Sequence, residues 1–320
     1  MHSVDEKVLA QVLEWLPTQA PVWLCTIVAT YGSSPRPVGS LFACNAAGET
    51  VGSLSGGCVE EDLVARIVAG GEDVQHTQVL EYGVSAEENE RLGLPCGGKL
   101  EVLLEPLDNL ALAHIQELHA AVHNRSALRR EVCVEDGSRS LHATDGYAPL
   151  QFADGTLRHV FGPRYRLLLV GAGQLSQTIS ELAVAMDYQV YVCDPRRELL
   201  ANWGGADVQL IGGMPDDAVR NYATDTDSIV LTLTHDPRID DMALMEALQH
   251  DLFYIGALGS ARTSAARRER LLQLDISAAE LDRLHAPVGL PIGSKTPMEI
   301  AIAVLAQLTQ LRSARVKAMA

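Results

Sequence analysis

Apolar residues in the first third of the chain recur at two different spacings. From residue 3 to residue 16 they return every three or four positions until Pro17, which predicts an amphipathic helix. The same spacing over residues 59–71, ended by two glycines, predicts a second helix. Short β-branched or alternating segments predict strands at 22–30, 40–55 and 99–107. Residues 1–107 are therefore expected to form an α+β domain.

The pattern becomes weaker in the middle of the chain. Residues 114–125 keep a helical spacing, whereas residues 131–160 contain short strand-like pieces and turns without a clear period. We therefore expect residues 108–160 to connect two domains.

From Arg166 onward, short apolar strands alternate with helical segments. This alternation predicts a parallel sheet with helices on both faces and right-handed crossovers. The segment 296–318 predicts a long final helix, with Thr296 as its N-cap and Pro297 and Glu299 in its first turn. The predicted fold class is α/β, with an N-terminal α+β domain followed by a Rossmann-like, doubly wound parallel-sheet domain over residues 161–320.

The composition of the 320 residues narrows the classes of function. Apolar residues make up 47% of the chain and charged residues 21%, which excludes a disordered protein. The formal net charge of −16 repels phosphate backbones and anionic lipids, so neither nucleic acid nor a membrane is an expected partner. The first residues lack the pattern of a secretory signal, and no apolar run reaches the ~18 residues of a membrane span, so we expect a cytoplasmic protein.

The sequence LLLVGAGQLS carries the first candidate site. Gly171 and Gly173 follow a buried strand and precede a helix, where a dinucleotide-binding fold needs a tight turn and helix amides that bind a phosphate. Asp194 ends the next strand, where its carboxylate can accept hydrogen bonds from ribose hydroxyls. Ser176 stands in place of the third glycine of the motif. The alternative interpretation is a Rossmann domain without nucleotide affinity.

Two further segments are expected at the same edge of the parallel sheet. Gly259 and Ser260 lead into a helix and form either a second phosphate pocket or a helix cap. His235 follows the fourth strand together with Asp236 and Asp240. A histidine and a carboxylate at this place perform acid–base chemistry or, more commonly, cap the next helix.

A loop in the N-terminal half combines groups that suit an anion. In ATYGSSPRPVGS, the hydroxyls of Ser33 and Ser34 and the guanidinium of Arg36 follow an apolar strand, between prolines and glycines that stiffen the backbone. A guanidinium binds oxyanions through two parallel hydrogen bonds. The loop is therefore a candidate binding site for a cofactor.

Two of the six cysteines lie beside paired glycines. Cys58 follows Gly56 and Gly57 at the start of a helix, where free amides and the helix dipole favour a thiolate. Cys96 precedes two glycines in LPCGGKLEV. Glycines let the backbone approach a ligand closely, so Gly56 and Gly57 are candidate cofactor-binding residues. Both cysteines are candidates for a nucleophile, and Cys58 is the candidate metal ligand. The cysteines interpreted instead as small buried apolar residues are Cys25, Cys133 and Cys193. Without CxxC, HxH or HExxH spacing, no disulfide and no dedicated zinc or iron site is expected.

Seven ordered motifs together resemble those of one known family. They are GSSPRPVGSLF, GSLSGGCVEEDL, PCGGKLEVLLEP, the GAG turn with CDPR, THDPRIDD, YIGALGSARTS and VGLPIGSKTPMEIAIAVLAQL. In this order they resemble the XdhC/CoxI family, accessory proteins of molybdenum hydroxylases such as xanthine dehydrogenase. The resemblance covers nearly the whole chain and identifies Cys58 and Cys96 as the two cysteines of the family.

The resemblance implies a chaperone more than a turnover enzyme. Such a protein binds the molybdenum cofactor as molybdopterin or its cytosine dinucleotide and protects it. It supports the exchange of an oxo for a sulfido ligand and delivers the cofactor to a molybdoenzyme. The implied partners are an apo molybdenum hydroxylase, a cysteine desulfurase and a cofactor-synthesising enzyme.

These inferences lead to a hypothesis for cofactor placement. We expect the metal end near Cys58 and the loop 33–36, and the nucleotide tail over Gly171 and Gly173, with the cofactor between the two domains. A nucleotide such as CTP, CMP or NAD is a further ligand expected at the Rossmann turn. A homodimer is expected because a site made of two domain faces is easily completed across a two-fold interface.

Two other classes of function remain open at this point. The first is an NAD-dependent oxidoreductase that uses the GAGQLS turn and Asp194, although the N-terminal half offers no evident Lys/Tyr pair or zinc set for hydride chemistry. The second is a nucleotide-sensing scaffold in which Cys58 and Cys96 have only a structural role.

Overall fold

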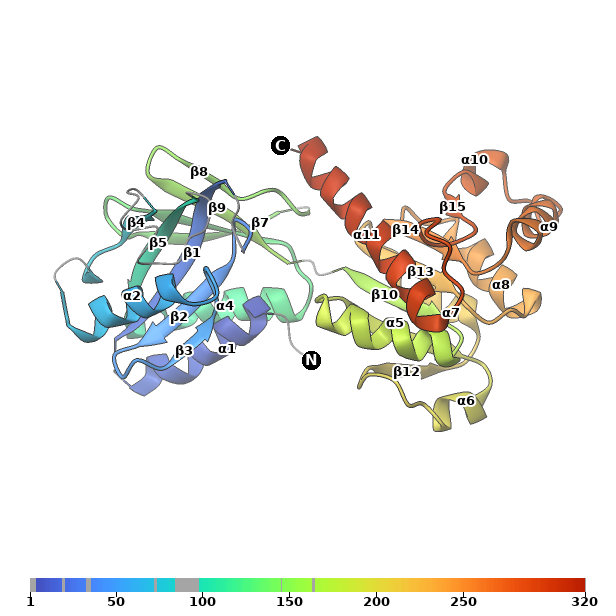
Figure 1. The fold of residues 1–320 in the computed structure, drawn as a ribbon, viewed down its shortest axis with the longest axis horizontal. Coiled ribbons are helices and arrows are strands. Elements are labelled where there is room, and N and C mark those ends of the chain that lie inside the picture. The colour runs from blue at the N-terminus through green and yellow to red at the C-terminus, as the bar shows by residue number, and fades with distance from the viewer. Residues whose placement is uncertain are drawn as a thin grey trace. The chain divides into compact units, whose positions relative to one another are not determined.

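The chain divides into two compact units in the computed structural model (Figure 1). The structure describes residues 4–18, 21–32, 36–71, 74–83, 98–144, 146–162 and 165–319. By their contacts, the residues up to 163 form the N-terminal unit and those from 164 onward form the C-terminal unit. Each unit has its own hydrophobic clusters and its own sheets.

The N-terminal unit contains a five-stranded antiparallel sheet in the order β3-β2-β1-β5-β4 and a four-stranded antiparallel sheet in the order β7-β6-β9-β8. Its elements are α1 (Val4–Trp15), η1 (Leu16–Thr18), β1 (Val22–Tyr31), β2 (Leu41–Asn45), β3 (Thr50–Gly52), α2 (Cys58–Val68), β4 (Gln78–Tyr82), β5 (Lys99–Leu107), η3 (Asn109–Ala111), α4 (Leu112–His123), β6 (Leu128–Cys133), β7 (Arg139–Ala143), β8 (Gln151–Ala153) and β9 (Thr156–Phe161). The helices and strands predicted for residues 1–107 are present, and β4 is an additional strand.

The two faces of the five-stranded sheet are covered by different elements. Along β1, Val22 and Leu24 pack with α1 and α4, whereas Trp23 and Cys25 point to the other face and pack with α2. This alternation follows the period of two in a strand. Because β1 is buried on both faces, its sequence is largely apolar, with Thr26 among the buried positions.

Residues 108–160 form more structure than the expected connector. They contain α4 and the whole four-stranded sheet, and they belong by contact to the N-terminal unit. The inward positions of β6 are Leu128, Arg130 and Val132. Because the middle inward residue is charged, the strand does not show the alternation of apolar and polar residues that would have revealed it.

The C-terminal unit is a six-stranded parallel sheet in the order β12-β11-β10-β13-β14-β15. Numbered within the unit, this is the order 3-2-1-4-5-6 of the dinucleotide-binding Rossmann fold. Its elements are β10 (Arg166–Val170), α5 (Gln174–Ala185), β11 (Gln189–Asp194), α6 (Arg197–Ala201), β12 (Gln209–Gly212), α7 (Pro215–Tyr222), β13 (Ser228–Thr232), α8 (Pro237–Ala247), β14 (Tyr254–Ala257), α9 (Ala261–Leu272), α10 (Ala278–Leu281), β15 (Leu284–His285) and α11 (Pro297–Met319). The predicted fold class is confirmed.

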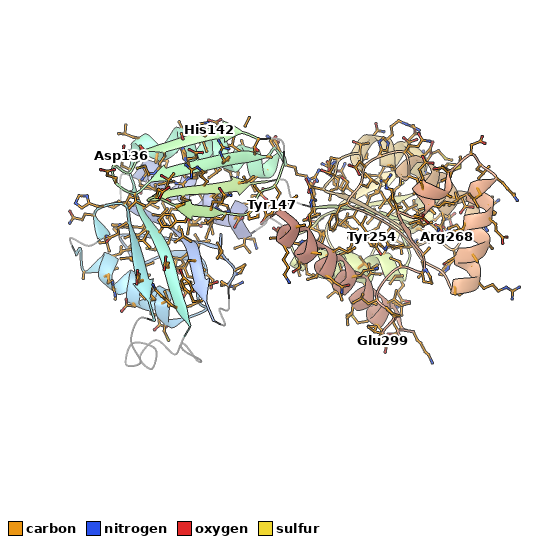
Figure 2. All side chains as sticks on the ribbon, turned by 90° about the horizontal axis from the view of Figure 1, so that it is seen from above. Asp136, His142, Tyr147, Tyr254, Arg268 and Glu299 are labelled. Carbon is orange, nitrogen blue, oxygen red and sulfur yellow. The ribbon has the colours of Figure 1, made fainter. Side chains whose placement is uncertain are left out.

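Helices cover both faces of the parallel sheet. On one face α7, α8 and α9 contribute to a core that includes Leu168 and Val230, and on the other α5 and α11 pack against Leu169 and Leu231. The start of α11 has the predicted cap: the Glu299 carboxylate accepts the backbone amide of Thr296, and the Thr296 hydroxyl accepts the amide of Glu299. Figure 2 labels Glu299 at this end of α11 and Tyr254 inside the unit. Within the described residues, no helix is long and apolar enough to cross a membrane.

Candidate functional site

Cys58 occupies the first position of α2 and is exposed. The strand β3 ends at Gly52, and the turn 53–57 leads from it into the helix. Gly57 is the N-cap of α2, and an added Cβ atom on Gly56 or Gly57 would meet no described atom within 4 Å. The thiol therefore lies on an open surface at the positive end of a helix dipole, as the sequence predicts.

The turn before Cys58 is held by the carboxylate of Glu60. Its Oε1 accepts the backbone amides of Leu54, Ser55 and Gly56, at 2.8–2.9 Å, and its Oε2 accepts the amide of Gly57 at 3.1 Å. The hydroxyls of Ser53 and Ser55 also donate to this carboxylate. Burial acts in the opposite direction, but these donors lower the pKa of Glu60 to about 2. Glu60 is thus charged at neutral pH and shapes the turn.

Arg36 and the turn before Cys58 lie at one end of the five-stranded sheet. Because β1 and β3 end there and the antiparallel β5 begins there, the exposed Arg36 follows β1 and the Cys58 turn follows β3 at the same end of the sheet. At this end Tyr31 pairs with Lys99, and a Cβ atom on Gly32 would lie 3.5 Å from Gly98. The candidate residues Ser33, Ser34 and Cys96 lie outside the described residues.

Three other cysteines are poor nucleophiles. Burial raises the pKa of Cys25 well above its usual range and raises the pKa of Cys44 and of Cys193 to about 12. Cys133 is half-buried at the end of β6. Among the five described cysteines, Cys58 alone is exposed.

In the C-terminal unit, four loops leave the same edge of the parallel sheet. Val170 pairs with both Cys193 and Thr232, and Thr232 pairs with Ala257, so the strands β11, β10, β13 and β14 end at one level. The strand order reverses between β10 and β13, which is where ligands of such sheets bind. Gly171 and the expected His235, Gly259 and Ser260 therefore lie at one edge.

The turn after β10 is packed on one side and open on the other. Gly171 has a φ of +112°, and a Cβ atom there would lie 2.8 Å from Thr234 Cγ2. Gly173 is the N-cap of α5 without a side-chain cap, and a Cβ atom there would meet no described atom within 4 Å. Open space before uncapped helix amides suits an anion.

Asp194 is arranged differently from the ribose acceptor that the sequence predicts. Its side chain is fully buried, and its two oxygens accept the backbone amides of Ala172 and Arg196 and both the Nε and Nη2 of Arg196, at 2.8–2.9 Å. Despite the opposing effect of burial, these hydrogen bonds hold the pKa of Asp194 below its ordinary value. The carboxylate supports the Gly171 turn by accepting the Ala172 amide. Its other acceptor positions are filled by Arg196 of this chain and not by a ribose.

The residues after β13 and β14 act mainly as caps and supports. Asp236 caps α8 by accepting the amide of Arg238, and Ser260 caps α9 by accepting the amide of Thr263. Asp240 is fully buried and accepts both the amide and the hydroxyl of Thr234 as well as Nη2 of Arg267. His235 is exposed, with a φ of +63°. For Ser260, the helix-cap interpretation is therefore the arrangement observed.

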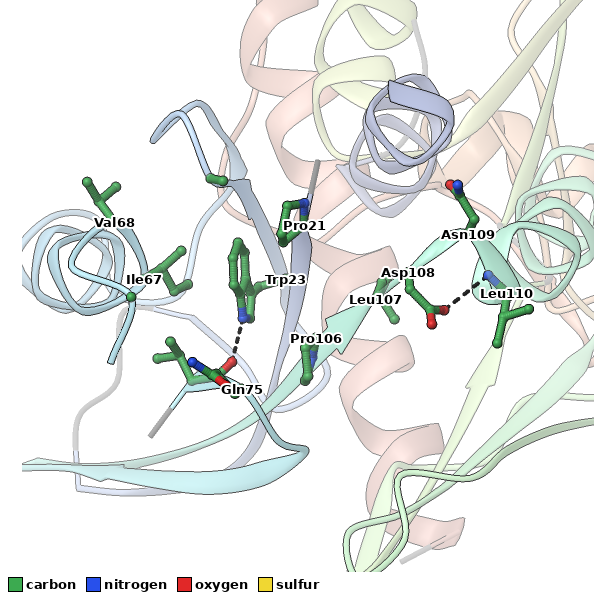
Figure 3. Close-up of a pocket in the computed structure, with 13 residues that line it drawn as sticks. Pro21, Trp23, Ile67, Val68, Gln75, Pro106, Leu107, Asp108, Asn109 and Leu110 are labelled. Carbon is green, nitrogen blue, oxygen red and sulfur yellow. Dashed lines mark hydrogen bonds between the residues drawn. The ribbon is translucent and has the colours of Figure 1, made fainter. Parts of the chain in front are cut away.

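A pocket of about 880 Å³ lies within the N-terminal unit, lined partly by the C-terminal end of α2 (Figure 3). It is lined by Trp23, whose Nε1 donates to the carbonyl of Val74 at 2.6 Å, and by Ile67 and Val68 from the C-terminal end of α2. Val68 lies ten residues after Cys58, which corresponds to ~15 Å along the helix. The pocket is therefore not the surface that presents the thiol.

Two family models match the chain. The model of the XdhC Rossmann domain matches residues 167–308, and the model of the XdhC and CoxI family matches residues 15–83. The chain belongs to the XdhC and CoxI family. The first match spans the parallel sheet, and the second includes the Cys58 turn.

Relatives of this XdhC/CoxI-family chain match it over most of its length. It is 28% identical to a probable xanthine dehydrogenase subunit of Bacillus subtilis, over 93% of this chain and 95% of that protein. It is also 28% identical to "Molybdenum cofactor insertion chaperone PaoD" of Escherichia coli, over 90% of this chain and 83% of that protein. A crystal structure described as a xanthine dehydrogenase from Bacillus halodurans has a TM-score of 0.80 and 28% identity, and the match covers 100% of this chain and 98% of that one.

Two carboxylates of this family member have structural roles that the sequence motifs do not indicate. Glu60 is not among the predicted site residues. Its place at the third position of a helix could have indicated its role, because an acidic residue there is the usual partner of an N-cap amide. Asp194 is predicted with another role. Both residues bind backbone amides of the turns that carry Cys58 and Gly171.

Proposed function

We propose that this protein is a maturation chaperone that binds the molybdenum cofactor and inserts it into a xanthine dehydrogenase-type molybdoenzyme. The observation that carries this proposal is the similarity, over 90% of the chain, to a protein named as a molybdenum cofactor insertion chaperone. The similarity to a probable xanthine dehydrogenase subunit supports the same class of client. The cofactor is here the cargo of the protein.

The N-terminal unit suits the metal end of such a cargo. Within the described residues, no group of three His, Cys, Asp or Glu side chains is placed to hold a metal ion by itself. A dithiolene-bound molybdenum carries its own sulfur ligands, so one exposed soft donor is enough to make contact. We propose that Cys58 supplies this contact, as a ligand or as a carrier of transferred sulfur, and that Cys96 and the loop 33–36 contribute to the same site.

The C-terminal unit suits the phosphate-bearing end. The open, uncapped amides behind Gly173 favour an anion at the edge where such sheets bind ligands. We propose that this turn, with Gly171, His235, Gly259 and Ser260 around it, takes the phosphate of molybdopterin or the pyrophosphate of its cytosine dinucleotide. CMP would bind there as a fragment of the cytosine dinucleotide, and CTP as an analogue with the same cytidine and linked phosphates.

The alternative of an NAD-dependent oxidoreductase is less well supported. In that class the acidic residue after the second strand accepts hydrogen bonds from the adenosine ribose. Here the corresponding Asp194 is buried, and its acceptor positions are filled by Ala172 and Arg196.

We propose a cytoplasmic homodimer that meets a cofactor-synthesising enzyme, a cysteine desulfurase and the apo-enzyme in turn.

A reconstitution assay tests this proposal. Cofactor-loaded wild-type protein is mixed with an apo xanthine dehydrogenase, with and without a cysteine desulfurase and cysteine, and the recovered activity is measured. We expect transfer from the wild type and a loss of at least tenfold for Cys58→Ala, because the thiol is the proposed contact with the metal end. Cys133→Ala is the matched control and should transfer normally. Equal transfer by both variants would remove Cys58 from the mechanism.

A further inference from the structure

The Ser53–Gly57 turn has the backbone geometry of an anion-binding nest. Four successive amides, from Leu54 to Gly57, point at one carboxylate, and two serine hydroxyls point at it as well. Successive amides aimed at one point form a concave site for an anion. In this chain the anion is internal, because it is the side chain of Glu60, three positions into α2.

The filled nest has two consequences for Cys58. First, the filled nest orders the backbone before Cys58. Charge-assisted hydrogen bonds to consecutive amides fix the turn that sets where α2 begins, and Cys58 is the first residue of that helix. Second, the filled nest does not accept another anion. The amides of Gly56 and Gly57 are already bound to a carboxylate and are not free for a phosphate. The paired glycines therefore differ from the ligand-binding amides that the sequence suggests.

We infer that Glu60 is the positioning residue of the Cys58 thiol, and that its carboxylate reserves the Ser53–Gly57 turn for the sulfur-binding end of the cargo by keeping phosphates out of the nest. This inference deepens the proposed function and rests on it only in treating Cys58 as the contact with the cargo. The phosphate-bearing end must then bind at another place, such as the open helix start behind Gly173.

Alkylation of Cys58 in the full-length protein tests the inference without molybdenum. The rates of reaction with iodoacetamide, which is neutral, and iodoacetate, which is an anion, are measured at Cys58 by peptide mapping. In the wild type the filled nest should give iodoacetate no advantage. In Glu60→Ala the vacated amides can bind the carboxylate of iodoacetate beside the thiol. The ratio of the iodoacetate rate to the iodoacetamide rate should therefore rise roughly tenfold, about the effect of one charge-assisted hydrogen bond. Added acetate should compete and lower the ratio again.

Glu61→Ala is the matched control for this experiment. Glu61 lies in the same helical turn and is exposed, and its side chain has no hydrogen bond with the turn among the described residues, so its removal changes the local charge alone. Amide hydrogen exchange provides a second measurement: Glu60→Gln should speed exchange at residues 54–57 by roughly tenfold or more and leave the sheet unchanged.

The possible outcomes separate clearly. A raised, acetate-sensitive ratio in Glu60→Ala but not in Glu61→Ala supports the inference. Equal ratios in the two variants would overturn it. If Glu60→Ala does not fold, exchange in Glu60→Gln decides, and protection at residues 54–57 equal to that of the wild type would overturn the inference. Failure of the proposed function would appear separately, as absence of bound molybdenum in a protein whose turn behaves as described.

Discussion

Arg130→Met should destabilise the N-terminal unit by about 3–5 kcal/mol, because it leaves the carboxylate of Glu105 buried without its main partner. Both side chains are fully buried, and two hydrogen bonds of 2.8 and 2.6 Å join Arg130 Nη1 and Nη2 to the two oxygens of Glu105. Arg139 donates a further hydrogen bond to Glu105 at 3.2 Å and is only partly buried. Hydrogen exchange of the β5 and β6 amides during urea titration measures the loss.

A neighbouring arginine provides the control for this effect. Arg129 lies on the same strand, but its side chain is 42% exposed and pairs with Glu131 at the surface. Arg129→Met should change the free energy of unfolding by no more than about 0.5 kcal/mol. The double variant Glu105→Leu/Arg130→Met should recover most of the stability, since a buried pair replaced by apolar residues is often neutral. Equal losses for Arg129→Met and Arg130→Met would contradict this account.

The loss caused by Arg130→Met should depend on pH. Although burial acts in the opposite direction, Arg130 and Arg139 lower the pKa of Glu105 below its ordinary value of 4.5. A carboxyl with a lowered pKa contributes stability above the pKa of the unfolded state and loses this contribution as the pH falls through its folded-state pKa. The difference between wild type and Arg130→Met should therefore be full at neutral pH and shrink below about pH 4.5.

Gly171→Ala should destabilise the C-terminal unit by about 2–6 kcal/mol, from backbone strain of roughly 1–3 kcal/mol and a similar amount of overpacking. With its φ of +112°, Gly171 has a conformation that favours glycine. The added methyl group would lie 2.8 Å from Thr234 Cγ2 and 3.3 Å from the backbone carbonyl carbon of Leu233. Thermal unfolding followed by exchange of the β10 and β13 amides measures this change.

Gly173→Ala separates packing from binding. At Gly173 the φ is −84° and the space is open, so alanine should cost at most about 1 kcal/mol, as a weaker N-cap. The methyl group would, however, stand where we propose that a phosphate approaches α5. We expect the affinity for CTP, measured by calorimetry, to fall roughly tenfold in a protein of near-normal stability. Unchanged CTP affinity in Gly173→Ala would argue against a phosphate at this turn.

The fold could be predicted from the sequence where strands are apolar and periods are regular. The parallel sheet is of this kind, since β10 and β13 are short apolar runs and each is followed by a helix. The four-stranded sheet of the N-terminal unit could not be predicted in this way. Its strand β6 turns Arg130 inward, and that side chain is stable there because Glu105, 25 residues earlier, meets it. A partner so distant in the sequence leaves no local pattern.

The candidate site was predictable as a set of loops, but the roles of its carboxylates were not. The glycines beside Cys58 and in the Gly171 turn indicated where the backbone is exposed, and the structure places both at turns that lead into helices. Whether a turn amide is free for a ligand depends on where nearby carboxylate oxygens point. Glu60 and Asp194 each accept backbone amides of their turn, which follows from the course of irregular backbone and not from residue spacing.

The most direct test of the proposed function is the content of the protein purified without oxygen from a host that makes molybdenum cofactor. Molybdenum, the released pterin and any released CMP are measured for the wild type, for Cys58→Ala and for the control Cys133→Ala. We expect molybdenum together with pterin in the wild type and the control, and background levels in Cys58→Ala. A wild-type protein that contains no molybdenum but copurifies with NAD would contradict the proposed function and favour an oxidoreductase.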